Sequence, residues 1–345
     1  MKPRFDAVDV ARGLALIAMA AYHFTWDLAF YGVVERSTPF TPPMRLASHA
    51  IGAAFLALAG LSLALAHGRG LRPRPFAIRL TKIAAASVAV TAASYFIAPT
   101  ALIGFGILHC IGAASLLTLP LLMATFPPPL RGRVREQGFL SPRQPSPLKR
   151  EGVSPAAPRK TSALAALAGG VLLVAAPFIW SSPAFNQPWL VWLGLGTEPP
   201  STLDWRPLMP WGGVLWIGLG LGLLNPPLPA WTARAAPSRA LVFAGRHSLA
   251  IYLIHQPILI GLLSSALFLT GANDRLASEA YVKACRPACV EAGGEIAACE
   301  HACACVARDA KSAGLASRLS ASQVADAERK RLGAIVEACG ADPDH

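Results

Sequence analysis

The sequence alternates long apolar runs with short polar segments. A run of about 20 apolar residues is long enough to cross a bilayer, and a segment in lipid must satisfy its backbone hydrogen bonds internally, as a helix does. Seven runs fit this description, at about 13–32, 46–66, 82–98, 103–126, 161–180, 209–224 and 248–270. The pattern therefore predicts an all-α fold, a polytopic membrane helix bundle of about seven transmembrane helices.

The composition agrees with a membrane protein. Of the 345 residues, 54% are hydrophobic and 14% are charged, whereas soluble domains usually carry about a quarter charged residues. The net charge of +12 does not indicate nucleic-acid binding, because the basic residues lie in short segments between the apolar runs. We therefore expect the lipid bilayer, and no nucleic acid, as a partner.

Basic residues favour alternate connecting segments. The N-terminus and the segments 67–82, 127–160 and 225–247 hold 19 of the 31 lysines and arginines. The other three connections hold Arg36, Arg45 and Arg206. Because short loops rich in lysine and arginine stay in the cytoplasm, we expect a cytoplasmic N-terminus and an external C-terminus.

Two segments resemble something other than a transmembrane helix. The start of the chain resembles a signal peptide, but Asp6 and Asp9 interrupt its basic leader, so we expect it to be retained. Residues 127–160 are rich in proline, arginine and serine without an apolar period, which predicts a disordered basic linker in the cytoplasm. The chain thus divides into a transmembrane domain, 1–270, and a tail, 271–345.

The tail is rich in cysteine. Its six cysteines are Cys285, Cys289, Cys299, Cys303, Cys305 and Cys339, and the seventh, Cys110, lies in an apolar run. An even number of cysteines outside the cell indicates disulfides, which would staple a segment too small for a large core. A metal site that includes His301 is the alternative reading, and we expect no metal.

The cysteine spacing suggests a pairing. Both C-x3-C pairs would occupy one face of a helix, and Gly293 and Gly294 would separate two antiparallel arms. Such a hairpin joins Cys285 to Cys303 and Cys289 to Cys299, although Pro287 fits poorly inside a helix. Cys305 is then left for Cys339, on a third arm that begins at Ser320 with Gln323 as a capping box.

Four ionisable residues interrupt the first apolar run, DVARGLALIAMAAYHFTWDLAFYG. They are Asp9, Arg12, His23 and Asp27. Eleven residues separate Arg12 from His23, a spacing that returns to nearly the same helix face at 3.6 residues per turn. Asp9 and Asp27 fall close to that face, so the pattern predicts one line of ionisable groups along the helix.

These residues differ in depth. Arg12 and Asp9 lie near a helix end, where an arginine can also reach the membrane surface and only mark a boundary. His23 and Asp27 lie well inside the run, where ionisable groups are costly and indicate function. One turn apart, they predict a general base with an orienting carboxylate. His23, Asp27 and Arg12 are therefore the candidate catalytic residues.

Further polar residues stand in or beside other apolar runs. His255 and Gln256 lie in the last run, His49 and His109 near the outer ends of the second and fourth, and Asp204 precedes the sixth. A single such histidine is more often a satisfied core residue than a ligand. Taken together, these residues predict a polar cavity within the bundle.

Four segments, in order, resemble the bacterial relatives of heparan-alpha-glucosaminide N-acetyltransferase, the domain-of-unknown-function 1624 group among transmembrane acyltransferases. They are RFDAVDVARGLALIAMAAYHFTWDLAFYG, GFGILHCIGAASLL, DWRPLMPWGG and GRHSLAIYLIHQPILIGLL. The resemblance covers roughly 4–270 without the linker. The R-x10-H spacing of Arg12 and His23 is also similar to that of membrane acyltransferases that modify surface glycans. The linker and tail depart from the family pattern and leave the acceptor open.

The resemblance implies a bacterial inner-membrane acetyltransferase. It would move an acetyl group from cytoplasmic acetyl-CoA to a sugar or amino sugar on the periplasmic side. Arg12, Asp9 and His255 would bind the donor, and His23 would act as general base or carry the acetyl group covalently. Both mechanisms stay open, as does a homodimer.

Two other functions remain alternatives. Histidines in a helix bundle can ligate a b-type haem for electron transfer, and His49 and His109 have similar depth. A polar pathway would also suit a carrier or flippase for a sugar or lipid.

Overall fold

The computed structural model describes residues 6–67, 71–125, 156–224, 235–319 and 324–341. Its described residues form helices and turns without a strand, which confirms the all-α prediction. Two compact units can be distinguished. The first contains residues 1–18 and 49–253, and the second contains residues 19–48 and 254–345.

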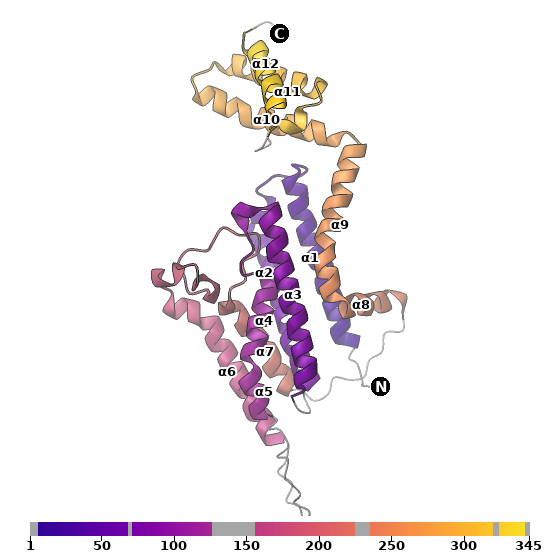
Figure 1. Cartoon of the computed structure of the whole chain (residues 1–345), viewed down its shortest axis with the longest axis vertical. Helices are drawn as coiled ribbons and strands as arrows, with labels where there is room; N and C mark the ends of the chain where they lie inside the picture. Colours follow the sequence, from indigo (N-terminus) through magenta and orange to yellow (C-terminus); the bar gives the residue numbers. More distant parts are fainter. Residues whose placement is uncertain (1–5, 68–70, 126–155, 225–234, 320–323, 342–345) are drawn as a thin grey trace, which may run out of the picture. The chain divides into compact units, whose positions relative to one another are not determined.

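Before the tail, the described residues form nine helices, of which all but α8 correspond to apolar runs (Figure 1). These are α1 Asp6–Phe30, α2 Pro42–His67, α3 Pro73–Ile97, α4 Ile107–Leu117, α5 Leu119–Thr125, α6 Ala156–Trp180, α7 Leu208–Leu224, α8 Ala236–Arg246 and α9 Ser248–Leu269. By length and composition, five can cross a membrane: α1, α2, α3, α9 and the Arg159–Trp180 part of α6. Each predicted run therefore has a helical counterpart, and two of these counterparts, Ile107–Met123 and α7, are shorter.

The fourth run is divided in two at Thr118. The Thr118 hydroxyl donates to the Ser115 carbonyl at 2.6 Å, and Pro120 cannot donate a backbone hydrogen bond at all. Helix α4 therefore ends at Leu117 and α5 begins at Leu119.

Two segments expected to be loops are partly helical. Helix α3 begins at Pro73, inside the basic segment 67–82, and α8 lies inside 225–247. Proline is favoured in the first turn of a helix, where its missing N–H is not needed. Arg79 and Lys82 therefore project from a helix and not from a loop, which corrects the prediction.

The helix that follows the basic linker begins earlier in the sequence than expected. Helix α6 already begins at Ala156, inside the predicted segment 127–160. Most of that segment, up to residue 155, lies outside the described residues.

Small residues allow close helix packing in the first unit. A Cβ atom at Gly60 of α2 would overlap the Leu215 carbonyl of α7, and one at Gly218 of α7 would overlap the Ala57 carbonyl of α2. Leu56, Leu63, Leu215 and Leu219 are fully buried around this contact. The core of the first unit thus depends on close backbone approach, as in other membrane bundles.

Large apolar side chains cover the outer faces of the long helices. Phe96, Phe178 and Leu269 are 82%, 86% and 82% exposed. In water such surfaces would favour association, whereas lipid tails cover them without cost. This exposure agrees with helices that cross a membrane.

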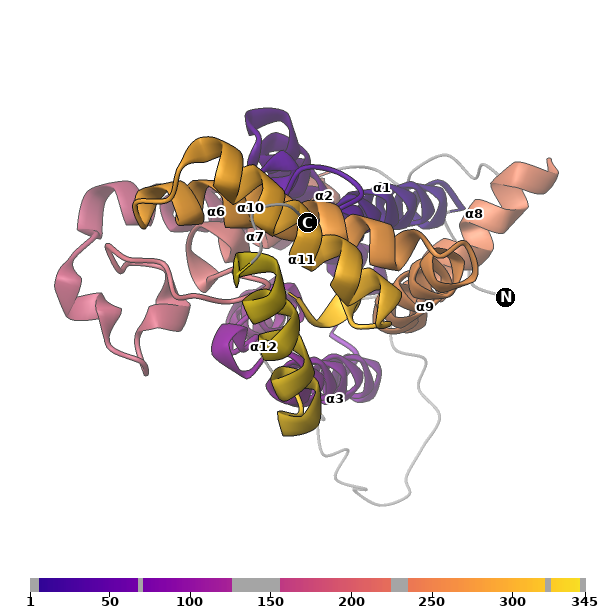
Figure 2. The same ribbon diagram turned by 90° about the horizontal axis from the view of Figure 1, so that it is seen from above.

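The tail in the second unit forms three further helices (Figure 2). They are α10 Ala272–Glu291, α11 Ile296–Ser312 and α12 Asp326–Ala341. Gly293 has a φ of 94°, a left-handed conformation that glycine adopts readily, and lies between α10 and α11. The predicted hairpin is confirmed, with Pro287 accommodated inside α10.

All three predicted disulfides are present. Cys285 is bonded to Cys303, Cys289 to Cys299, and Cys305 to Cys339. Cys110 is free and buried in the first unit. The third arm, α12, begins at Asp326, while the expected start at Ser320 and its capping partner Gln323 lie outside the described residues.

Candidate functional site

Helices α1 and α9 bring four polar side chains together in the second unit. Gln256 contacts two of them: its Nε2 donates to Asp27 Oδ1 at 2.5 Å, and its Oε1 lies 3.0 Å from His23 Nδ1. His255 Nε2 lies 3.3 Å from the same His23 nitrogen, with the two ring centroids 4.9 Å apart. These two histidines, which we predicted separately, therefore belong to one group.

With Asp27 ionised, the hydrogen-bond network assigns the proton of the neutral His23 ring to one nitrogen. An ionised carboxylate only accepts hydrogen bonds, so the Gln256 amide must direct its NH₂ toward Asp27. Its carbonyl oxygen then faces His23, and Nδ1 must donate to it. The other ring nitrogen, Nε2, is left with a lone pair, which is the form needed for a base or nucleophile.

Asp27 is connected to His23 by hydrogen bonds through Gln256. We expected this carboxylate, one turn from the histidine, to orient the ring itself, and the sequence offered no sign of an amide between them. Asp27 is only 5% exposed, and its Oδ2 has no hydrogen-bond partner among the described residues. A buried carboxylate oxygen in this state is an available acceptor for a donor group on a ligand.

One further contact joins Tyr31, directly after α1, to helix α9. The Tyr31 hydroxyl lies 3.0 Å from Ser264 Oγ, about two turns of α9 beyond Gln256. Sequence reasoning did not single out either residue. The contact fixes α1 beside α9 without touching His23.

A second polar group lies in the first unit, at the start of α1. Arg12 Nη1 lies 3.1 Å from Asp9 Oδ1, and Arg12 Nη2 donates to Ser62 Oγ on α2. Arg246, at the end of α8, contacts Asp9 Oδ2 at 3.2 Å and Asp6 Oδ1 at 2.9 Å. Asp9 thus forms ion pairs with two arginines. Arg246 belongs to this polar group, although the sequence alone suggested only a basic residue in a loop.

Asp204 occupies the start of α4 in the first unit. Its Oδ2 accepts from the Ile107 N–H at 2.8 Å, a position where a helix favours negative charge. Burial raises the pKa of the Asp204 carboxyl, while the Ile107 hydrogen bond, Arg206 and His109 act in the opposite direction. These contacts explain Asp204 as a cap for α4.

His109 and His49 have separate surroundings in this unit. His109 Nδ1 accepts from the Gly106 N–H at 3.3 Å, and its Nε2 lies 3.3 Å from Thr91 Oγ1. The His49 ring stacks on Trp211, with ring centroids 5.4 Å apart. Both histidines, together with Asp204, belong to the first unit, whereas His23 and His255 belong to the second.

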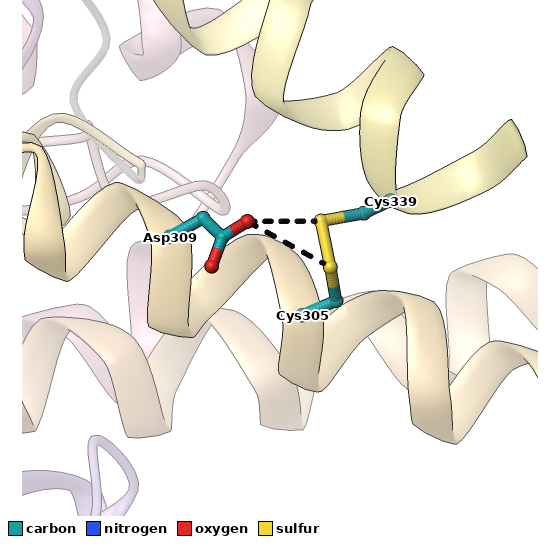
Figure 3. Close-up of side chains that lie close together, drawn as sticks. All are labelled: Cys305, Asp309 and Cys339. Carbon is teal, nitrogen blue, oxygen red and sulfur yellow. Dashed lines mark hydrogen bonds between the residues drawn. A yellow bond between two sulfur atoms is a disulfide. The ribbon is translucent and has the colours of Figure 1, made fainter. Parts of the chain in front are cut away.

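Within the described residues of the tail, Cys305, Asp309 and Cys339 form a cluster of possible metal ligands, shown in Figure 3. Asp309 Oδ2 lies 4.0 Å from the Cys305 sulfur and 3.9 Å from the Cys339 sulfur. The two sulfurs are bonded to each other, so neither is a thiolate that could ligate a metal ion. His301, the residue of the alternative metal reading, is exposed on α11.

The part of the chain that contains the apolar helices matches a known protein family. Residues 4–130 and 156–257, more than half of the sequence, match the family model described as heparan-alpha-glucosaminide N-acetyltransferase, catalytic. The match includes the groups around Arg12 and His23, and it excludes the tail. No curated protein and no solved structure matches the chain. The chain belongs to the heparan-alpha-glucosaminide N-acetyltransferase catalytic family, as its resemblance predicted.

Proposed function

We propose that this protein transfers an acetyl group from cytoplasmic acetyl-CoA to a sugar or amino sugar on the opposite side of a bacterial inner membrane. Family membership supports membrane acetyl transfer in general, and the family's name describes transfer to the nitrogen of an amino sugar. The observation that carries the proposal is the hydrogen-bonded group of His23, Gln256 and Asp27.

His23 Nε2 would be the reacting atom. As a general base, it takes the proton from the acceptor amine or hydroxyl while that acceptor attacks the thioester carbonyl. The carbon–sulfur bond then breaks, and the CoA thiolate leaves and is protonated. As a nucleophile, Nε2 would itself form the bond to the acetyl carbon, release CoA, and pass the acetyl group to the acceptor in a second step.

Gln256 and Asp27 would hold the ring for either route. When Nε2 gains a proton or an acetyl group, the ring becomes positive, and the Asp27 charge stabilises it through the amide. The open Oδ2 of Asp27 would accept a hydrogen bond from the acceptor, which an amine or hydroxyl can donate. His255, next to His23, would contact the acetyl end of the donor.

The Arg12 group would serve the donor. Acyl-CoA carries phosphate groups, and arginine binds phosphate through a planar pair of N–H donors. Asp9 would orient Arg12 through their ion pair. In this proposal, residues 1–270 form the transmembrane domain and residues 271–345 form the tail. The N-terminus lies in the cytoplasm and the tail lies outside.

The test is acetyl transfer by the full chain in sealed vesicles. Labelled acetyl-CoA is supplied on one side and a panel of sugars and amino sugars on the other, and labelled product and free CoA are both measured. We expect a product from at least one amino sugar, and His23→Ala to lower its rate about 10²-fold or more. His301→Ala, a change of the exposed tail histidine, should have no effect.

Two outcomes would contradict the proposal. Sugar movement without CoA release would indicate a carrier instead of a transferase. Full transfer by well-folded His23→Ala protein would exclude His23 as the reacting residue.

A further inference from the structure

Arg79 is a partly buried cation, and the described part of the chain offers it no acidic partner. It lies on α3, and its Nη2 donates to the Ala59 carbonyl on α2 at 3.4 Å. Among the described residues no carboxylate forms an ion pair with it, unlike Arg12 and Arg246. A guanidinium has five N–H donors, so most of those on Arg79 have no acceptor among the residues that the structure describes.

Arg79 lies close to Arg12. Ala59 and Ser62, which contact the two arginines, are three residues apart on α2 and therefore neighbours on one helix face. The positive charge of Arg12 is close enough to act unfavourably on the guanidinium of Arg79. Both arginines donate to α2, so both guanidiniums are turned toward the same face of that helix.

The charges around this pair do not cancel. Asp6 and Asp9 are both held by Arg246, and Asp9 also holds Arg12. Arg12 and Arg246 therefore occupy both carboxylates, and neither carboxylate pairs with Arg79. An unpaired cation inside a bundle is unfavourable unless a ligand of opposite charge completes the site.

We propose that Arg12 and Arg79, with the Ser62 hydroxyl beside them, bind a phosphate group. Two guanidiniums and a hydroxyl provide the convergent N–H and O–H donors that phosphate oxygens accept. The inference deepens the proposed function, on which it rests, because it gives the donor's phosphate a second arginine. The same chemistry would also accept the phosphate of an anionic lipid headgroup.

The test measures binding and not transfer. The full chain is reconstituted in nanodiscs of neutral phosphatidylcholine, and the dissociation constants of CoA and of phosphate-free pantetheine are determined. We expect Arg79→Gln to weaken CoA binding about tenfold or more, without changing the affinity for pantetheine. Arg79→Lys should give an intermediate loss, because it keeps the charge but not the fork of donors.

Arg74→Gln is the matched control. Arg74 is an exposed basic residue on the same helix, so its change removes one charge without touching the pair. A tenfold loss with Arg79→Gln alone supports the site. Equal losses in the two variants would indicate a general charge effect and overturn it, as would unchanged CoA binding in folded Arg79→Gln protein.

A second arm identifies the source of the phosphate. Phosphatidylglycerol is added to the nanodiscs, and CoA binding to the wild type is measured again. Competition that disappears in Arg79→Gln assigns the site to a lipid headgroup, and no competition assigns it to the soluble donor; both support the shared chemistry. His23→Ala, which should bind CoA normally without transfer, separates failure of this site from failure of the proposed reaction.

Discussion

A single amide connects the charge of Asp27 to the ring of His23. Because Gln256 can meet both neighbours in only one orientation, it selects the tautomer of the histidine as well as its position. A carboxylate in direct contact would do the same but would place a full charge against the ring. The interposed amide keeps that charge one residue further from the reacting nitrogen.

Gln256→Leu tests this role. Leucine has a similar size but removes both hydrogen bonds, so His23 loses the acceptor that holds its proton on Nδ1. We expect kcat to fall about 10- to 100-fold with little change in the KM for acetyl-CoA, since only the reacting state is affected. Asp27→Asn should cause a smaller loss, because the amide network can still form.

Tyr31→Phe provides the control for helix contact. It removes the hydrogen bond between Tyr31, directly after α1, and Ser264 on α9, and leaves His23 untouched. Near-normal kcat in Tyr31→Phe protein and a loss in Gln256→Leu protein would together identify the tautomer effect. A similar loss in both variants would instead show that any contact between these helices is needed.

The sequence predicted the candidate residues better than their contacts. Ionisable residues deep in apolar runs are few, because placing them inside a membrane costs free energy. His23, Asp27 and His255 could therefore be found from the sequence alone. Their contacts depend on how α1 and α9 face each other, and residues 229 positions apart, such as Asp27 and Gln256, carry no local pattern. The unpaired state of Arg79 is likewise visible only when its neighbours on α2 are known.

At the scale of helices, the close contact of α2 with α7 depends on two glycines. Neither contact tolerates a Cβ atom, because the obstacle on each side is a backbone carbonyl that cannot rotate away. The helices must then separate or shift along each other. A methyl group there should disturb the core more than its size suggests.

Gly60→Ala should therefore lower the thermal stability of the purified protein by several degrees. Gly261→Ala, on α9, is the matched control, because a Cβ atom at Gly261 would have nothing within 4 Å. Alanine favours helix over glycine, so this control should be neutral or slightly stabilising. Equal melting temperatures for the two variants would show that α2 and α7 do not pack as described.

Elements with a strong local signal were predicted well. The apolar runs, the C-x3-C pairs and the two glycines between them each act within a few residues. Two disulfides follow from them directly, and the third, Cys305–Cys339, follows by elimination. Features with a weak or ambiguous sequence signal were not predicted. The break at Thr118 stands inside a continuous apolar run, and the arginines at the start of α3 suggested a loop although they are good helix formers.

At the scale of the whole chain, the distribution of basic residues predicts its orientation. A reporter active only in the periplasm should function when fused after residue 345 and fail when fused after residue 145. A reporter active only in the cytoplasm, fused at the same two positions, is the control for expression. The opposite pattern would reverse the orientation and place the disulfide tail in a reducing compartment.

The disulfide connectivity of the tail also determines the order in which its bonds can form during biosynthesis. The bonds Cys289–Cys299 and Cys285–Cys303 are nested and span 10 and 18 residues, so with the tail outside, both can close once α11 has crossed the membrane. Cys305 must wait for Cys339, a further 34 residues, which take about 2 to 7 s to synthesise at roughly 5–20 residues per second. During biosynthesis the hairpin can thus be locked before the end of the chain exists. A newly made protein that has lost its last helix would still carry two of its three covalent staples.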